Sequence, residues 1–257
     1  MLANRVVLVT GVANAKSIAW SVSKRLLEEK ANLVITYQRP EFRSKIEKLI
    51  ASECSQENQN KVRLCCCDVT KEEDLKGLES FVANQYNRVD SVFHSIAYAP
   101  SAALHNPIVD VSDADFCTTM SISAYSLISL TRTLQPLFSC QASILALSFI
   151  GSERYIPHYG VMSIAKAALE STAIQLAGSL GEKGIRVNVL RSSPINTLAA
   201  RGIPQFLEMK KAFLAKQCCP QEQPLEDVAS AVAWLLSENA KGVTGQVVNG
   251  SSMEVSL

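Results

Sequence analysis

The chain has 257 residues, of which 47% are hydrophobic and 19% are charged, and its formal net charge is +1 at pH 7. This composition is typical of a globular protein rather than a disordered one, and the length allows one large α/β domain or two small ones. The near-zero charge argues against a nucleic acid as partner, and no apolar run reaches the roughly 18 residues that a membrane span requires.

Apolar runs and helical patterns alternate along the sequence. The apolar runs predict strands at residues 6–10, 32–37, 62–67, 91–95, 143–149, 185–190 and 246–249. The helical patterns lie at residues 17–30, 41–52, 72–85, 113–134, 159–180 and 226–237. This alternation predicts a parallel sheet with helices on both faces, and continuously apolar strands fit such a doubly covered sheet. We therefore expect α/β architecture in a single domain over residues 1–257, with a Rossmann-like doubly wound parallel sheet of about seven strands.

The eight cysteines form no C-x-x-C pair, and no histidine stands at zinc-finger spacing from them. We therefore expect no metal site and interpret the cysteines as small buried hydrophobic residues in a reducing compartment. The printed N-terminus enters an apolar run directly, so we expect neither a signal nor a transit peptide, and a cytoplasmic location.

In doubly wound sheets, ligands bind beyond the carboxyl ends of the strands, near the point where the strand order reverses. We expect the site at this edge of the sheet. The predicted strands end at, or just before, Gly11, Gln38, Asp68, Ser95, Phe149 and Ser192.

The first strand is followed by T-G-V-A-N-A-K-S-I-A, which lacks the full G-x-G-x-x-G fingerprint. Gly11 allows a tight turn. Ser17 is a natural N-cap for a helix whose free N–H groups and positive dipole end suit a pyrophosphate. The plainer interpretation is that Gly11 only turns the chain and that Ser17 only caps the helix.

Two other strand ends suggest contacts with a nucleotide. Gln38 follows the second strand, where dinucleotide-binding folds usually carry an acidic residue for the ribose hydroxyls. Arg39 and Arg43 are near enough in sequence to hold a 2′-phosphate, so NADH and NADPH both stay open. Asp68 can accept a hydrogen bond from an adenine amino group or simply begin a turn. We expect His94 to be packed or hydrogen-bonded rather than catalytic.

Residues 148–169 carry the main catalytic candidates. Tyr159 and Lys166 are seven positions apart, about two helical turns, so both lie on one helical face. A neighbouring positive charge lowers the pKa of a phenol, and such a pair suits donation to a carbonyl oxygen that becomes negative. Taken alone, the same spacing also fits two polar residues on the solvated rim of an amphipathic helix.

The motifs resemble those of the short-chain dehydrogenase/reductase superfamily and, within it, the bacterial-type enoyl-acyl-carrier-protein reductases. The similarity runs from about Val6 to Val248. The Tyr-x6-Lys spacing is its most specific feature, because most of the superfamily uses Tyr-x3-Lys. The motifs are G-V-A-N-A-K-S-I-A, T-Y-Q, C-D-V, H-S-I-A-Y-A-P, S-I-S-A-Y-S-L, G-S-E-R-Y-I-P-H-Y-G-V-M-S-I-A-K, K-G-I-R-V-N and P-I-N-T-L-A-A.

The resemblance implies hydride transfer from NADH to the β-carbon of a trans-2-enoyl thioester in fatty-acid elongation. Tyr159 would hydrogen-bond the enolate oxygen, and Lys166 would hold the nicotinamide ribose. The residues implied to line the cofactor are Gly11, Ser17, Ile18, Gln38, Asp68, Val69, Ser95, Ile96, Lys166, Ile195 and Thr197. Those implied to contact the substrate are Ala99, Phe149, Tyr159, Leu198, Ile203 and Phe206.

The resemblance also implies a substrate lid at about residues 196–213, although the same stretch fits an amphipathic surface helix. The thioester would be carried by acyl carrier protein or by CoA, and similar proteins are commonly homotetramers.

The sequence departs from the family pattern around the expected site. Phe149 stands where the family usually has a second tyrosine, and Ser192 and Ser193 replace the usual Ala-Gly before Pro194. The lid has only Arg201, Lys210 and Lys211 as basic residues to meet an acidic carrier protein. Two alternatives therefore remain: a reductase of another carbonyl or enone substrate, and a dinucleotide-binding pseudoenzyme that acts as a partner.

Overall fold

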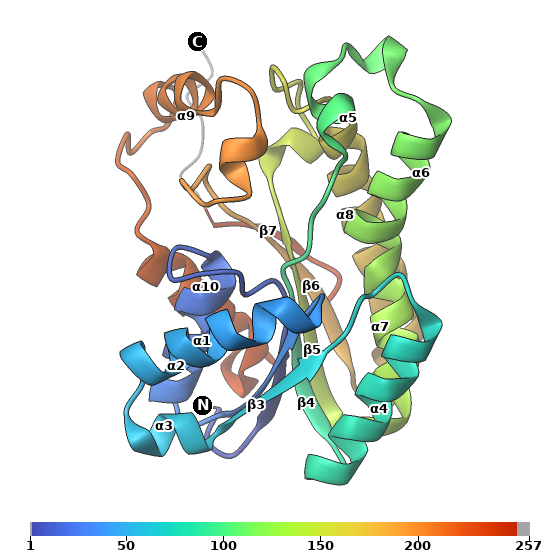
Figure 1. Ribbon diagram of the computed structural model, residues 1–257, viewed down its shortest axis with the longest axis vertical. Coiled ribbons are helices and arrows are strands. Elements are labelled where there is room, and N and C mark those ends of the chain that lie inside the picture. Colours follow the sequence, from blue (N-terminus) through green and yellow to red (C-terminus); the bar gives the residue numbers. More distant parts are fainter. Residues whose placement is uncertain (1, 251–257) are drawn as a thin grey trace.

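Seven parallel strands form the centre of the protein in a computed structural model, which describes residues 2–250 (Figure 1). Their order is β3-β2-β1-β4-β5-β6-β7, so it reverses between β1 and β4. The predicted doubly wound parallel sheet is confirmed. The strands are β1 (Val6–Val9), β2 (Asn32–Tyr37), β3 (Val62–Cys66), β4 (Val89–His94), β5 (Phe138–Ser148), β6 (Arg186–Arg191) and β7 (Val247–Asn249).

Helices cover both faces of this sheet (Figure 1). The apolar residues of α1 (Ile18–Glu28), α2 (Arg43–Glu53) and α10 (Leu225–Leu236) pack in one core cluster. Those of α4 (Glu72–Tyr86), α7 (Ser126–Leu134) and α8 (Gly160–Leu180) pack in a second cluster on the opposite face.

Strand β1 shows why the strands are continuously apolar. Val7 and Val9 belong to the first core cluster, whereas Val6 and Leu8 belong to the second. Successive side chains of a strand point to opposite faces, so a sheet that is covered twice needs an apolar residue at every position. Each fully buried aliphatic side chain contributes about 1.5–3 kcal/mol, which favours this register strongly.

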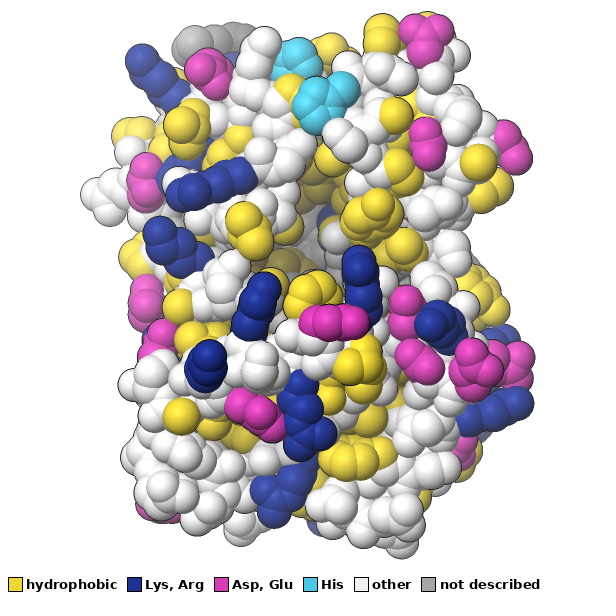
Figure 2. All heavy atoms as spheres, in the orientation of Figure 1, with side chains coloured by type: hydrophobic (Ala, Val, Ile, Leu, Met, Phe, Trp, Pro, Cys, Tyr) yellow, Lys and Arg dark blue, Asp and Glu magenta, His cyan; other side chains and the backbone are white. Residues whose placement is uncertain are grey.

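Shorter elements complete the chain. Figure 1 shows α5 and α9 above the carboxyl ends of the strands, and Figure 2 shows the surface hollowed beneath this upper layer. The shorter helices are α3 (Gln56–Asn60), α5 (Ser101–His105), α6 (Asp113–Met120) and α9 (Phe206–Ala215). The sequence did not predict α3 or α5. The stretch expected as a lid contains a 3₁₀ turn, Ala200–Gly202, followed by most of α9.

The expected helix over residues 113–134 is interrupted. It divides into α6, a π-helical turn (Ser121–Tyr125) and α7. Ser123 Oγ donates to Tyr98 O and accepts from Tyr98 N, at 2.9 Å each, and Ser126 Oγ donates to Ile122 O at 2.6 Å. Serine side chains that bond to the backbone compete with regular helical pairing, and π-turns often occur at functional sites.

Other predictions need smaller corrections. β5 begins at Phe138 rather than at residue 143, and it ends one residue before Phe149. The expectation of buried cysteines holds for Cys65 and Cys67. It is wrong for four exposed cysteines, which are Cys117, Cys140, Cys218 and Cys219. Among residues 2–250, no helix has the length and apolar character to cross a membrane.

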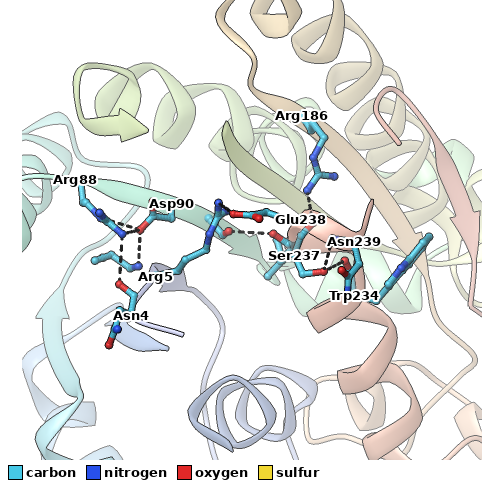
Figure 3. A network of polar contacts seen from close by, with 12 residues as sticks. Asn4, Arg5, Arg88, Asp90, Arg186, Trp234, Ser237, Glu238 and Asn239 are labelled. Atoms are coloured by element: carbon cyan, nitrogen blue, oxygen red, sulfur yellow. Dashed lines mark hydrogen bonds and ion pairs between the residues drawn. The ribbon is translucent and has the colours of Figure 1, made fainter. Parts of the chain in front are cut away.

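A polar network joins the amino ends of the strands to the end of α10 (Figure 3). Arg186 donates to Leu235 O and Ser237 O, both at 3.0 Å, and to Val243 O at 3.1 Å. These carbonyl oxygens also accept from Ser143 Oγ, Ala240 N and Asn188 Nδ2, so the guanidinium of Arg186 adds a second donor to each and joins β6 to the end of α10.

The same network also contains two ion pairs. Asp90 pairs with Arg88 at 2.9 Å and accepts from Val6 N at 2.7 Å, which fixes the start of β1 to β4. Arg5 pairs with Glu238 at 2.8 Å. In this network, the arginine side chains bind carbonyl oxygens or carboxylates.

Candidate active site

The chain turns at Gly11, where the strand order reverses. Gly11 has a φ of +88°, and a Cβ placed on it would lie 2.0 Å from Ser95 O. Only glycine allows this approach between the ends of β1 and β4. Ser95 N also donates to Thr10 Oγ1 at 3.0 Å, which ties the two strand ends together.

Ser17 occupies the position before α1, as expected, but its side chain does not cap the helix. Its Oγ donates instead to Asn14 O at 2.6 Å and accepts from Ala13 N at 3.4 Å. The first turn of α1, which begins at Ile18, contains no acidic residue. The positive end of the helix therefore faces the Gly11 turn without a competing carboxylate.

The polar residues at the ends of β2 and β3 contact each other. Gln38 Nε2 donates to Asp68 Oδ2 at 3.1 Å, and Thr70 donates to Asp68 Oδ1 through its N–H and its hydroxyl. Burial raises the pKa of Asp68, but the hydrogen bonds from Thr70 and Gln38 outweigh it and leave the pKa below its ordinary value. Asp68 is thus an anionic acceptor beside an amide.

The two arginines after β2 differ in their surroundings. Arg43 pairs with Glu47 at 2.8 Å, whereas the guanidinium of Arg39 lies 5.7 Å from the ring centre of Phe42. The guanidinium of Arg39 therefore lies over an aromatic ring, whereas that of Arg43 is paired with a carboxylate.

Two apolar candidates lie beyond the strands. Val69 follows β3 and Ile96 follows β4, and both pack against the second core cluster. They form an apolar surface next to Asp68 and Ser95.

Tyr159 and Lys166 are both buried, with 6% of each residue exposed. Tyr159 immediately precedes α8, and Lys166 follows two turns into it. Lys166 Nζ donates to Leu147 O at 2.8 Å. Burial lowers the pKa of Lys166 to about 8, although the carboxylate of Glu170 acts in the opposite direction.

The expected effect of the lysine on the phenol is not what the structure gives. Burial raises the pKa of Tyr159 well above its ordinary value, and the negative charge of Glu170 adds to this. Desolvation disfavours the phenolate, and the carboxylate of Glu170 disfavours it further. Tyr159 is therefore a hydrogen-bond donor over the whole range of physiological pH.

Neighbouring residues fix the ring of Tyr159. A Cβ on Gly151 would lie 2.6 Å from Tyr159 Cδ1, so the turn that follows β5 packs directly on this ring. The ring of Phe149 meets it edge to face, with the ring centres 5.1 Å apart. The phenol thus has one well-defined direction.

An apolar cluster forms the wall around Tyr159. Its buried members are Ala99, Ala103, Phe149, Tyr159, Val161, Met162 and Phe213, and the partly buried Ile203 and Met209 pack against them. The ring centre of Phe213, from α9, lies 6.1 Å from that of Phe149. The segment after β6 therefore lies over the phenol.

The predicted substrate residues divide accordingly. Ala99, Phe149 and Ile203 lie in this cluster with Tyr159. Phe206 is buried but is not a member, and Leu198 is 64% exposed. Phe213 and Met209 were not predicted as contacts, although both belong to the apolar helical pattern of the same stretch.

The loop from β6 to this segment is held by local hydrogen bonds. Ser193 Oγ donates to Gln223 Oε1 at 2.9 Å, and Ser192 N donates to Ser148 O at 3.1 Å. Thr197 N donates to Ile195 O at 2.8 Å. Of the two serines that replace Ala-Gly, Ser193 uses its side chain to bind a neighbouring segment, whereas Ser192 does so through its backbone N–H.

A buried ion pair lies beneath Tyr159 and Lys166, and the sequence analysis missed it. Glu170 accepts from Arg191 Nε at 2.9 Å and pairs with Arg191 Nη2 at 2.7 Å. Ser148 Oγ and Ser152 Oγ also donate to it, at 2.6 and 2.7 Å. The available signals were the position of Glu170 one turn after Lys166 and an arginine that ends an apolar strand.

His94 behaves as expected. It is fully buried, and its Nε2 lies 2.8 Å from Ser126 Oγ. Burial, together with the ammonium of Lys166, lowers the pKa of His94 to about 3. The imidazole is therefore neutral and hydrogen-bonded to the start of α7.

A dinucleotide bound to a doubly wound sheet lies across the point where the strand order reverses. In this protein the Gly11 turn and the start of α1 lie at that point. The buried phenol of Tyr159 and the buried ammonium of Lys166 lie beyond the strands at the same edge of the sheet. This arrangement defines a dinucleotide-dependent oxidoreductase of the α/β class.

Comparison with known proteins narrows this class. The model of the family described as Enoyl-(Acyl carrier protein) reductase matches residues 11–250. The chain is 36% identical over 250 residues to the NADH-dependent enoyl-acyl-carrier-protein reductase FabI of Aquifex aeolicus, which covers 97% of this chain and 90% of the relative. It is 33% identical over 249 residues to the FabI of Haemophilus influenzae, covering 96% and 93%.

Solved structures agree with these relatives. The crystal structure of the Aquifex aeolicus enzyme superimposes with a TM-score of 0.91 at 36% identity, covering 97% of this chain and 96% of that one. The Bacillus cereus enoyl-acyl-carrier-protein reductase, solved with NADP+ and indole naphthyridinone, gives 0.91 at 31% identity, covering 97% and 95%. The chain belongs to the enoyl-acyl-carrier-protein reductase family.

Proposed function

We propose that this protein reduces trans-2-enoyl thioesters with NADH in fatty-acid elongation. The observation that carries the proposal is the burial of Tyr159, just before α8, and of Lys166, about two turns into it, with an apolar cluster packed around the phenol. A donor held in a dry site and aimed at a developing negative charge is worth far more than the same donor in water.

The residues at the strand ends fit a dinucleotide. The turn at Gly11, which has no room for a side chain, and the start of α1 at Ser17 and Ile18 would receive the pyrophosphate. Gln38 would bind the adenosine ribose, and Asp68 would accept from the adenine amino group.

The remaining cofactor residues would lie along the dinucleotide. Val69, Ser95 and Ile96 would border its adenosine half and its centre. Ile195 and Thr197 would border the nicotinamide. Lys166 fits the nicotinamide ribose, because an ammonium has three N–H donors and, among the described residues, it uses one on Leu147 O.

A nicotinamide held there would supply a hydride for the β-carbon of the substrate, the double-bond electrons would move to the thioester oxygen, and a proton from solvent would complete the α-carbon. Tyr159 donates a hydrogen bond to that oxygen as its charge grows. Lys166 adds a positive charge nearby. A single donor of this kind stabilises the transition state by about 2–4 kcal/mol.

The apolar cluster would hold the acyl chain. Ala99, Phe149 and Ile203 would contact it, and Leu198 and Phe206 would extend the surface towards the entrance. Residues 196–213 would act as the lid, with Phe213 closing onto Phe149. Phe149 carries no hydroxyl, so Tyr159 alone would supply the phenolic donor.

The test is oxidation of NADH and NADPH with crotonyl-CoA and a longer 2-enoyl thioester, beside a panel of ketones. We expect turnover with the enoyl thioesters and a preference for NADH, since Gln38 suits a free ribose hydroxyl. Turnover on ketones alone would favour the other reductase. Tight NADH binding without turnover on any substrate would favour the pseudoenzyme.

We also propose acyl carrier protein as the natural carrier, with CoA thioesters as substitutes. The lid offers Arg201, Lys210 and Lys211 to an acidic carrier, although Lys210 is already paired with Glu222 at 2.8 Å. Kinetics with the same acyl group on both carriers test this. A lower KM for the carrier-protein thioester is expected, and a lower KM for the CoA thioester would contradict it.

For the whole protein we propose a single domain, a homotetramer and a cytoplasmic location. Exposed apolar residues on the helices that cover the second core support assembly, for example Tyr125, Ile164 and Ile174. Eight cysteines, none of them in a disulfide among the described residues, support a reducing compartment. Sedimentation velocity tests the tetramer, one cooperative unfolding transition tests the single domain, and cell fractionation tests the location.

A further inference from the structure

The carboxylate of Glu170 connects three segments of the site. Glu170 lies on α8 and is 7% exposed. It accepts hydrogen bonds from Ser148 at the end of β5, Ser152 in the turn that follows, and Arg191 at the end of β6. Arg191 pairs in turn with Glu153. One buried carboxylate thus fixes the ends of two strands and a turn to one helix.

The end of β5 and the turn after it each carry a residue that touches a catalytic group. Leu147, next to Ser148, accepts the hydrogen bond from Lys166 Nζ. Gly151, next to Ser152, packs against the ring of Tyr159. A shift of the turn after β5 would therefore displace the phenol.

The charge of Glu170 acts on the same groups. Burial alone would raise the pKa of Glu170, but the hydrogen bonds from Arg191, Ser148 and Ser152 hold it below its ordinary value. The carboxylate is therefore ionised, and its charge raises the pKa of Lys166 against the effect of burial.

The other groups around Lys166 do not provide a negative charge. His94, from β4, is neutral because burial and Lys166 itself lower its pKa to about 3. Tyr159 is neutral because burial raises its pKa. Glu153, beyond the turn, pairs with Arg191 from β6. Among the described residues, Glu170 is the carboxylate that stabilises the ammonium.

We propose that Glu170 is a positioning residue of the reductase site, which holds the Lys166 ammonium charged and fixes the turn beneath Tyr159, and that Arg191 holds Glu170 in place. The proposal rests on the proposed function for its kinetic test, and it predicts a separate titration that needs no turnover.

The first experiment is the pH profile of kcat/KM for Glu170→Gln. Glutamine keeps the volume and an acceptor oxygen for the two serines, but it removes the charge. In the wild type we expect kcat/KM to fall as the pH rises through about 8, where Lys166 loses its proton. In Glu170→Gln this alkaline limb should move to lower pH by about one pH unit, the size of a lost neighbouring charge.

Two matched variants separate charge from architecture. Ser152→Ala removes one hydrogen bond and leaves the carboxylate, so kcat falls while the alkaline limb stays in place. Glu170→Asp keeps the charge on a shorter stem, so the limb returns towards its wild-type position even if kcat remains low. A limb that moves as far in Ser152→Ala as in Glu170→Gln would contradict the proposal.

Arg191→Met tests the second half of the proposal. Without the guanidinium, the buried carboxylate takes up a proton more readily, and its charge is lost as the pH falls. The kcat/KM profile should gain an acidic limb that the wild type lacks. A profile that keeps the wild-type shape at reduced amplitude would show that Arg191 does not hold Glu170 ionised.

The titration of Lys166 itself separates this proposal from the proposed function. It is followed by NMR in protein labelled with ¹³C at the lysine Cε, with Lys166→Met used only for assignment. The expected pKa is lower in Glu170→Gln than in the wild type by about one pH unit. If the wild type fails to reduce enoyl thioesters, the proposed function fails and this titration still stands. Equal pKa values in the two proteins would overturn the inference.

Discussion

Two buried cations, Arg186 and Lys166, lie at opposite ends of the sheet and differ in how fully they are hydrogen-bonded. At the amino ends of the strands, Arg186 donates three hydrogen bonds to carbonyl oxygens, and Asp90 meets both an arginine and a backbone N–H (Figure 3). At the carboxyl ends, Lys166 donates one hydrogen bond among the described residues, and its pKa is lowered to about 8.

This difference separates groups that stabilise the fold from groups that are available to a ligand. A buried polar group with all its partners contributes to stability, whereas one that keeps unused donors carries a desolvation cost. Perturbed pKa values of the second kind are typical of functional sites. We therefore expect substitution of Arg186 to change mainly stability and substitution at the carboxyl ends to change mainly activity.

Tyr159→Phe should give the largest effect on activity. Loss of the donor to the thioester oxygen should lower kcat by about 30- to 1,000-fold, corresponding to about 2–4 kcal/mol. The measurement is steady-state oxidation of NADH with a 2-enoyl thioester, with NADH affinity as the control. A loss below threefold would remove Tyr159 from the proposed role.

Arg186→Met should give the largest effect on stability and leave the chemistry intact. Three buried carbonyl oxygens would each lose the bond from the guanidinium while keeping a second donor, and a hydrogen bond to a charged group contributes about 1.5–3 kcal/mol. We expect a lower urea midpoint with kcat unchanged in the fraction that remains folded. Arg5→Gln breaks an ion pair whose glutamate is largely exposed, so it serves as a control and should cost no more than about 1 kcal/mol.

Lys166→Met should distinguish the role of Lys166 from that of Arg186 most clearly, because it should stabilise the fold while activity falls. The ordinary pKa of 10.5 is lowered to about 8 in the folded protein, so folding disfavours the ammonium. This destabilisation is complete below pH 8 and disappears as the pH rises towards 10.5. At pH 7 the variant should gain about 1–3 kcal/mol over the wild type, and the gain should shrink at pH 10. A destabilised variant at pH 7 would contradict the account.

Phe149→Tyr should give the smallest effect. The ring already meets Tyr159 edge to face, so an added hydroxyl would reach the same region. If it binds the substrate oxygen, turnover should rise about fivefold, the effect of one hydrogen bond worth about 1 kcal/mol, with NADH affinity unchanged. Unchanged turnover would mean that the site works fully with one phenol.

The fold was largely predictable because each strand is a short apolar run between helical patterns. The parallel doubly wound sheet and the strand-end residues Gly11, Gln38, Asp68 and Ser95 follow from local sequence, and these residues lie at the expected edge of the sheet. The interruption of the helix at Ser121–Tyr125 was harder to predict from the sequence. It depends on Ser123 bonding to a distant backbone at Tyr98.

The features missed at the site depend on contacts between distant segments. Glu170 and Arg191 are 21 positions apart and meet only because β6 pairs beside β5. Phe213 approaches Phe149 through the path of the loop after β6. The direction of the Tyr159 pKa shift was wrong because spacing reveals a neighbouring lysine but not the degree of burial.

The central claim is that hydride reaches the β-carbon of an enoyl thioester at the carboxyl end of the sheet. The most direct measurement uses NADH deuterated at the transferable position with crotonyl-CoA, followed by mass spectrometry and NMR of the product. The account predicts a saturated butyryl thioester with one deuterium on the β-carbon. Deuterium on the carbinol carbon of a reduced ketone, with crotonyl-CoA untouched, would contradict it.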